Sequence, residues 1–202
     1  MTDPRNAVLD YLRRSQRAVE QASADQAFVA AIVAIGQRIA ASLKSGGKVM
    51  LAGNGGSAAD AQHIAAEFVG RFAFNRPPLP ALAFSVNTSC VTAIGNDYGF
   101  DLTFARQVEA LGRPGDVAVG ISTSGNSPNV LHGLAAAKKL GLHTVAFAGC
   151  TGGKMKDAAD YCICAPSNET PRIQECHILI GHIISELVEQ TIFHEQSRVS
   201  RS

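Results

Sequence analysis

The sequence predicts an α/β protein in which a doubly wound, five-stranded parallel sheet follows an N-terminal helical hairpin. Residues 7–44 carry helical periodicity and no strand signal, whereas five short apolar runs alternate with helical segments after Ser45-Gly46-Gly47. Strands this apolar are buried on both faces, so helices are expected on both sides of the sheet. The 202 residues suit a single domain, with residues 1–45 as the hairpin and residues 46–202 as the core and C-terminal helix.

Two helices are expected before the first strand, because apolar residues recur there at steps of three and four. Ala22-Ser23-Ala24-Asp25 supplies a break and an N-cap between them. These helices and the apolar last helix cannot bury all their apolar surface on one sheet, so we expect them to pack against another subunit. The periodic positions are Leu9, Leu12, Val19, Phe28, Ile32, Ile35, Ile39 and Leu43.

The elements of the core are predicted from apolar runs that are bounded by turn residues such as Gly112-Arg113-Pro114-Gly115 and Gly141. The predicted strands are Lys48–Ala52, Ala81–Ser85, Asp116–Ile121, His143–Ala148 and Tyr161–Ala165. The predicted helices are Ala58–Phe72, about Leu102–Leu111, Asn129–Leu140 and about Pro171–His194. In a parallel sheet of this kind, a ligand binds at the carboxyl ends of the strands.

Composition narrows the classes of function. Apolar residues make up 46% and charged residues 17%, and a net charge of +1 without a basic run gives nucleic-acid or membrane-surface binding no electrostatic support. No apolar stretch is expected to span a membrane, and the N-terminus has no signal-peptide core, so we expect a cytoplasmic protein. The five cysteines are odd in number and irregularly spaced, which indicates reduced thiols. Cys162 and Cys164 are interpreted as small core residues rather than as half of a zinc site.

The turn after the first strand suggests chemistry on a phosphorylated small molecule. Gly53-Asn54-Gly55-Gly56-Ser57 leads from a buried strand into a helix, which points unpaired backbone N–H groups at an anion. No lysine follows the glycines, which disfavours a nucleotide P-loop, and the absence of Gly-x-Gly-x-x-Gly weakens a dinucleotide site. In the helix that follows, His63 and Glu67 are four residues apart and share a face. Taken alone, such a pair is more often an ordinary exposed pair than a functional one.

Hydroxyl groups follow the third strand in the segment Ser122-Thr123-Ser124-Gly125-Asn126-Ser127. Hydroxyls and the N–H groups of a helix start can hold a phosphate without lysine, although serine and threonine are also common capping residues. Because two such turns fall on one edge of the sheet, we expect a phosphosugar site there. The loops after the second and fifth strands, with Gly95-Asn96-Asp97 and residues 166–172, are expected at the same edge. Arg172 either neutralises phosphate or pairs with a surface acid.

Several of these motifs, in this order, resemble the sugar isomerase (SIS) domain: Asn54-Gly55-Gly56-Ser57, Gly95-Asn96-Asp97, Ser122–Ser127 and Arg172-Ile173-Gln174-Glu175. Within that group the chain resembles the phosphoheptose isomerases over nearly its full length. The resemblance implies a flavodoxin-like sheet and a homotetramer with sites at subunit interfaces. It also implies an aldose–ketose isomerase that converts sedoheptulose 7-phosphate to D-glycero-D-manno-heptose 7-phosphate for bacterial lipopolysaccharide precursors.

The resemblance also implies roles for individual residues. Glu67 matches the catalytic base and His182 the catalytic acid, and Pro171 stands where some members carry a carboxylate. The positions that hold zinc in some members are matched by His63, Glu67, Gln174 and His182. The substrate-contacting positions are Asn54, Gly55, Gly56, Ser57, Glu67, Asn96, Asp97, Ser122, Thr123, Ser124, Ser127 and Gln174.

Physical reasoning supports Glu67 and His182, because moving a proton between adjacent carbons needs a carboxylate base and a donor near the carbonyl oxygen. Zinc would ease that step by polarising the carbonyl, but it competes with proton transfer for the same two side chains. Gln174 and His182 are eight residues apart, about 12 Å along a helix. Either Gln174 precedes the helix, or different subunits supply the two residues. His177 is the second candidate for the acid.

A different class of function is also considered, namely a non-catalytic SIS-domain regulator that binds a replication initiator protein. Relatives of that type lack a carboxylate at the position of Glu67 and a histidine at that of His182. Both residues are present in this chain, which favours the enzyme.

Overall fold

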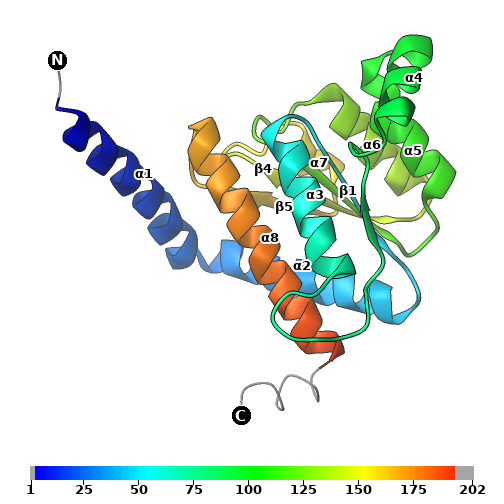
Figure 1. Ribbon diagram of the computed structural model, residues 1–202, viewed down its shortest axis with the longest axis horizontal. Coiled ribbons are helices and arrows are strands. Elements are labelled where there is room, and N and C mark those ends of the chain that lie inside the picture. The colour runs from blue at the N-terminus through cyan, green and yellow to red at the C-terminus, as the bar shows by residue number, and fades with distance from the viewer. Residues whose placement is uncertain (1–2, 194–202) are drawn as a thin grey trace.

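A five-stranded parallel sheet forms the centre of the computed structural model, which describes residues 3–193 (Figure 1). Its strands lie in the order β2-β1-β3-β4-β5, the flavodoxin-like form of a doubly wound sheet. The predicted fold class is therefore confirmed. The strands are β1 (Val49–Gly53), β2 (Ala81–Ala83), β3 (Val117–Ser122), β4 (His143–Ala148) and β5 (Tyr161–Cys164).

The switch point of this topology lies between β1 and β3. These strands are paired with Gly53 opposite Ile121, so the loops that follow them begin side by side at the carboxyl edge. Every residue of both strands is buried, which explains why continuous apolar runs marked them in the sequence. The fold thus brings together the two loops that were predicted to bind phosphate.

Helices cover both faces of the sheet. On one face lie α2 (Gln26–Lys44), α3 (Gly56–Val69) and α8 (Thr170–Ile192), and on the other lie α5 (Thr103–Leu111), α6 (Pro128–Lys139) and the short α7 (Met155–Ala158). Helices α3 and α8 run side by side (Figure 1). Their close approach depends on Gly181 of α8, where a Cβ would lie 2.5 Å from Cδ1 of Ile64. We call the line of contact between α3 and α8 the seam.

The first two helices, α1 (Pro4–Ala24) and α2, are joined by Asp25 alone. The Asp25 side chain accepts the N–H groups of Ala27 and Phe28, so the predicted break and cap are present. Figure 1 shows α1 diverging from α2 rather than folding back along it. Arg172, 1% exposed, ties α1 to α8 by donating to the Tyr11 carbonyl and the Ser15 hydroxyl. Arg172 also donates to the Glu175 carboxylate. The guanidinium therefore holds helices together and does not bind phosphate.

Element ends differ from the prediction by a few residues, and α4 (Thr88–Tyr98), the 3₁₀ turn η1 (Phe100–Leu102) and the four-residue α7 were not predicted. The segment after β2 was predicted as a loop but forms α4, followed by η1. Helix α4 has no buried residue, and its apolar positions Val91 and Ile94 are interrupted by the polar and glycine residues that indicated a loop. Its start is fixed by Asn87, whose side chain accepts the N–H of Cys90. The predicted end of the last helix at His194 lies outside the described residues.

One helix contradicts the expectation drawn from the apolar stretches. Among residues 3–193, α2 is long and apolar enough to cross a membrane by length and composition alone. In the fold this helix packs against α8 and β5, and Ile32, Ile35 and Ile39 are buried in the core. Buried core helices pass the same test, so its apolar character follows from packing.

Candidate active site

The turn after β1 has the geometry of an anion-binding helix start. Gly55 adopts a φ of +54°, which a residue with a side chain rarely adopts, and α3 begins at Gly56. Ser57 N–H donates to the Asn54 carbonyl at 3.0 Å, and the Ser57 side chain is buried. This end of α3 lies at the carboxyl edge of the sheet, where the positive end of the helix dipole favours a phosphate.

The turn after β3 holds a cluster of hydroxyl groups. Ser122 Oγ lies 2.8 Å from Ser127 Oγ and 3.3 Å from Ser124 Oγ, so the three hydroxyls converge. The side-chain amides of Asn54 and Asn129 exchange two hydrogen bonds of 2.9 Å and link the start of α6 to the turn after β1. The two predicted phosphate loops therefore form one rigid edge.

Three candidate residues meet on the seam. His63 Nε2 lies 3.1 Å from Glu67 Oε1 and 3.2 Å from His182 Nε2. The two imidazole rings are edge to face, with centroids 5.0 Å apart. Among the described residues, these three side chains form a group whose ligand atoms all lie within 4.8 Å of one another. The structure thus brings together residues 119 positions apart in the chain.

Asp60 lies on the same stripe of α3 as Gly56, His63 and Glu67, because these positions are separated by three or four residues. Its Oδ2 atom is buried without a hydrogen-bond partner. Burial raises the pKa of Asp60, and nearby His63 opposes that rise. Sequence reasoning assigned Asp60 no role, although its three-residue step to His63 could have placed it on this face.

Gln174 lies at the start of the seam, beside the turn after β1. A Cβ on Gly56 would lie 2.4 Å from Gln174 Nε2, so the amide covers the turn after β1. Gln174 is inside α8, which rules out the alternative that it precedes the helix. His63 follows Gly56 by seven residues, about 10 Å along α3. Gln174 therefore contacts the turn after β1, and its role as a metal ligand stays a prediction.

Other predicted residues lie elsewhere. Asn96 and Asp97 are exposed near the end of α4, where their side chains hydrogen-bond to each other at 2.8 Å, and not in a loop. His177, the second candidate acid, is fully buried, and its Nε2 lies 3.1 Å from the Ala148 carbonyl. Burial lowers the pKa of His177 to about 4. Because His177 lies inside the core, it cannot deliver a proton to a ligand on the seam.

Comparisons with known proteins agree with this geometry. A model of the SIS domain matches residues 10–149 of the chain. The phosphoheptose isomerase of Roseiflexus is 56% identical over 81% of this chain and 83% of that protein, and that of Burkholderia pseudomallei is 51% identical over 95% and 99%. The solved phosphoheptose isomerase of Neisseria gonorrhoeae is 42% identical and superposes with a TM-score of 0.86 over 93% of this chain and all of that chain.

A flavodoxin-like sheet with hydroxyl- and glycine-rich turns at its switch point, matched by the domain model over more than half of the chain, defines an SIS-domain protein. Within that class the identities are high and cover most of both chains. The chain belongs to the phosphoheptose isomerase family.

Proposed function

We propose that the protein is an aldose–ketose isomerase that converts sedoheptulose 7-phosphate to D-glycero-D-manno-heptose 7-phosphate. The observation that carries the proposal is the convergence of His63, Glu67 and His182 on the same seam whose start holds the phosphate loops. The family membership supports it, because the relatives named above are phosphoheptose isomerases. The comparisons do not support the alternative function, a non-catalytic regulator that binds a replication initiator protein.

The seam has a suitable length for this substrate. Ser57 and Glu67 are ten residues apart, about 15 Å along α3. Because the Glu67 carboxylate contacts His63, it lies about one helical turn closer to Ser57 than the Glu67 backbone does. The reacting group then lies roughly 10 Å from the loop. An extended seven-carbon sugar spans roughly 9 Å from its phosphorus to its carbonyl carbon at ordinary bond lengths. A phosphate at the turn after β1 therefore places the carbonyl end beside the cluster.

The proposed proton transfer uses two groups of this cluster. Glu67, whose side chain is 22% exposed, removes the proton from the carbon next to the carbonyl. His182 gives a proton to the carbonyl oxygen, which forms an enediol. The enediol collapses to the aldose when Glu67 returns its proton to the former carbonyl carbon and the hydroxyl on the neighbouring carbon gives its proton back to His182. Holding the far end of the sugar at the loops fixes both groups relative to the reacting carbons.

The same three side chains fit a zinc ion. His63 Nε2 faces both a carboxylate oxygen and another ring nitrogen. With both imidazoles neutral, no placement of the ring protons gives each of these three atoms its own hydrogen bond. Donors bound to zinc in a tetrahedral arrangement lie roughly 3.3 Å apart, close to the 3.1 and 3.2 Å found here. Bound zinc would polarise the substrate carbonyl. Because a ligand cannot also act as a free base, isomerisation that persists after exhaustive chelation would exclude an essential zinc.

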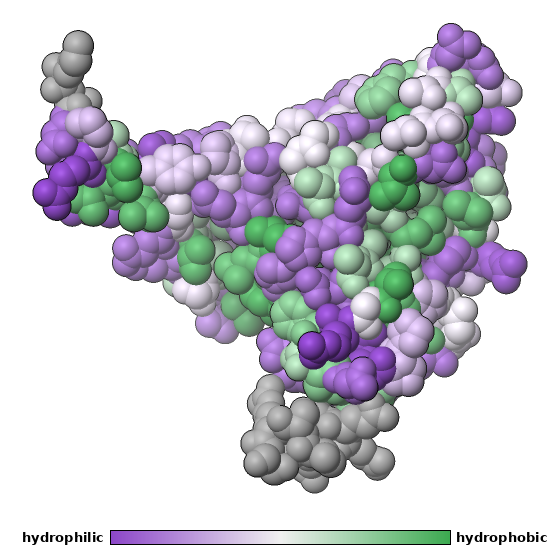
Figure 2. All heavy atoms as spheres, viewed as in Figure 1, coloured by the Kyte–Doolittle hydropathy of each residue, from purple (hydrophilic) through white to green (hydrophobic). Residues whose placement is uncertain are grey.

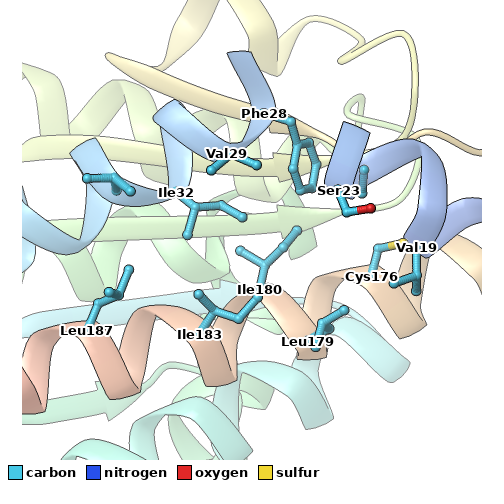
Figure 3. Close-up of a pocket in the computed structure, with 12 residues that line it drawn as sticks. Val19, Ser23, Phe28, Val29, Ile32, Cys176, Leu179, Ile180, Ile183 and Leu187 are labelled. Atoms are coloured by element: carbon cyan, nitrogen blue, oxygen red, sulfur yellow. The ribbon is translucent and has the colours of Figure 1, made fainter. Parts of the chain in front are cut away.

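We further propose a cytoplasmic homo-oligomer, with four subunits as the expected number. An apolar groove of about 350 Å³ lies between α1, α2 and α8 (Figure 3). Figure 2 shows apolar side chains gathered on α1 and along α8. A surface this apolar is typical of a subunit interface. The exposed large apolar residues of these helices are Val8, Leu9, Tyr11, Leu12, Val19, Val29, Val33, Leu179 and Ile183.

The test is an assay of aldose formation from sedoheptulose 7-phosphate by the purified protein, with Glu67→Gln and His182→Gln beside it. Removing a general base or acid typically costs about 100- to 10,000-fold in rate, so both variants should lose kcat by at least about 100-fold. The matched controls are Glu109→Gln and His132→Gln, which change exposed residues outside the seam and should retain the parent rate. Parent-like turnover in both seam variants would refute the assigned base and acid.

A further inference from the structure

A buried ion pair, Arg76–Glu189, lies just beyond the catalytic cluster and has no role in the function proposed above. Both side chains are only 1% exposed, and Arg76 Nε donates to Glu189 Oε2 at 2.8 Å. Burying two opposite charges adds little net stability, because the loss of hydration offsets their attraction. The position of this pair relative to Glu67 and His182 suggests another purpose.

Glu189, on α8, holds the segment that follows α3, which Figure 1 shows passing around the C-terminal part of α8. Burial by itself would raise the pKa of Glu189, but hydrogen bonds from this segment and from Arg76 lower it, so the carboxylate stays charged. The segment is thereby fixed with the ring centroid of Phe72 5.7 Å from that of His182. The backbone N–H groups that donate to Glu189 are those of Phe72, Ala73 and Phe74, at 2.9, 2.7 and 3.3 Å.

Arg76 caps the end of α3 that carries Glu67. Its Nη2 atom donates to the Glu67 carbonyl and its Nη1 atom to the Phe68 carbonyl, each at 2.8 Å. The last carbonyl groups of a helix have no partner within the helix. The guanidinium supplies that partner, so the backbone of Glu67 is fixed by the same ion pair that fixes the ring beside His182.

We infer that Arg76 and Glu189 are positioning residues that hold Glu67 and His182 in the arrangement needed for proton transfer, without touching the substrate. The inference rests on the proposed isomerase function. Glu189 follows His182 by seven residues and shares its face of α8, so the pair closes the seam at the end opposite the phosphate loops. A misplacement of about 1 Å at reacting groups can reduce a rate by about 100-fold.

The test uses Glu189→Gln and Arg76→Lys in the full-length protein. Glutamine keeps the shape of Glu189 but not its charge, and lysine cannot reach the Glu67 carbonyl and Glu189 together. Measured well below each unfolding midpoint, kcat for sedoheptulose 7-phosphate should fall at least about 10-fold, with KM within about two-fold. The affinity for Co²⁺, followed by its visible absorption, should also fall about 10-fold.

Asp116→Asn is the matched control, because Asp116 is also a buried carboxylate that holds backbone. It accepts the N–H groups of Lys48 at 2.9 Å and Arg113 at 2.8 Å, pairs with the Lys48 ammonium, and immediately precedes β3, at the edge of the sheet opposite the phosphate loops. The Asp116→Asn variant should have a lower unfolding midpoint, while its kcat and Co²⁺ affinity stay at parent values. If Arg76 and Glu189 only stabilise the fold, Glu189→Gln and Arg76→Lys should behave in the same way.

The inference is overturned if Glu189→Gln and Arg76→Lys lower only the unfolding midpoint. If either variant fails to fold, the double variant Arg76→Met/Glu189→Leu replaces both charges and leaves none buried and unpaired. The kcat of this double variant then tests the inference, and a value like that of the parent would contradict it. If the parent itself does not isomerise the sugar, the proposed function fails, and the Co²⁺ affinities alone decide whether the pair positions the cluster.

Discussion

Acidification should destabilise the protein through His177, a residue outside the candidate site. The imidazole is fully buried, its Nε2–H donates to the Ala148 carbonyl, and its Nδ1 has no partner. Burial lowers the pKa of His177 to about 4, from 6.5 for an ordinary histidine. The unfolded chain therefore binds a proton at a higher pH than the folded chain does. This contribution to stability is complete above pH 6.5 and is lost as the pH falls from 6.5 toward 4.

The size of the effect follows from proton linkage. With pKa values of 6.5 unfolded and about 4 folded, His177 removes about 2 kcal/mol from the free energy of unfolding between pH 7 and pH 5. For a chain of this length, that loss lowers the unfolding midpoint by about 4 to 8 °C. Glu189, whose pKa is lowered in the fold, loses its contribution only below the ordinary range of a glutamate.

The measurement compares thermal unfolding of the parent and His177→Gln at pH 7 and pH 5, at one protein concentration. Glutamine can still donate to the Ala148 carbonyl but does not titrate, so the loss between the two pH values should be about 2 kcal/mol smaller in the variant. All other titrating groups cancel in this difference. His132→Gln, which removes an exposed histidine, should keep the parent's pH dependence. Parallel curves for the parent and His177→Gln would refute the reasoning.

Three further changes test the site and the proposed assembly. Gly56→Ala should raise KM more than it lowers kcat, because the new Cβ would lie 2.4 Å from Gln174 Nε2 at the phosphate loop; steady-state kinetics with an unchanged KM would contradict this. Val29→Asp with Ile183→Asp should lower the sedimenting mass, because both line the apolar groove, whereas Leu111→Asp on α5 should leave it unchanged. Fructose 6-phosphate should show a kcat at least about 10-fold below that of sedoheptulose 7-phosphate, and equal kcat values would contradict a length requirement.

Local patterns predicted the parts of the fold that depend on local physics. Continuous apolar runs identified all five strands, and the four-residue step from His63 to Glu67 placed both on one helix face. The meeting of His63 with His182 depends instead on the seam, where Gly181 lets Ile64 approach. The sequence alone offered only a resemblance to a family for that contact. A pairing across 119 positions is set by packing, which no local period encodes.

The same reason explains why the ion pair was missed. Arg76 is followed by Pro77 and Pro78, a pattern typical of a stiff connector, and Glu189 lies in the last helix among apolar residues. Neither position indicates an ion pair, since a charged residue in a connector is ordinarily solvated. Only the path of the connector around α8 brings the two together and buries both. Long-range contacts between charged residues were therefore the least predictable feature of this chain.

In the proposed isomerase, the seam is expected to act as a molecular ruler for the sugar. The loops and Gln174 are at its start, the cluster lies about 10 Å further along α3, and Arg76–Glu189 closes its end. Shortening an extended sugar by one carbon withdraws its carbonyl by roughly 1.3 Å at ordinary bond lengths. That shift is comparable to the misplacement that costs about 100-fold in rate. In the proposed function, we therefore expect the fixed spacing along two packed helices to contribute to discrimination by chain length.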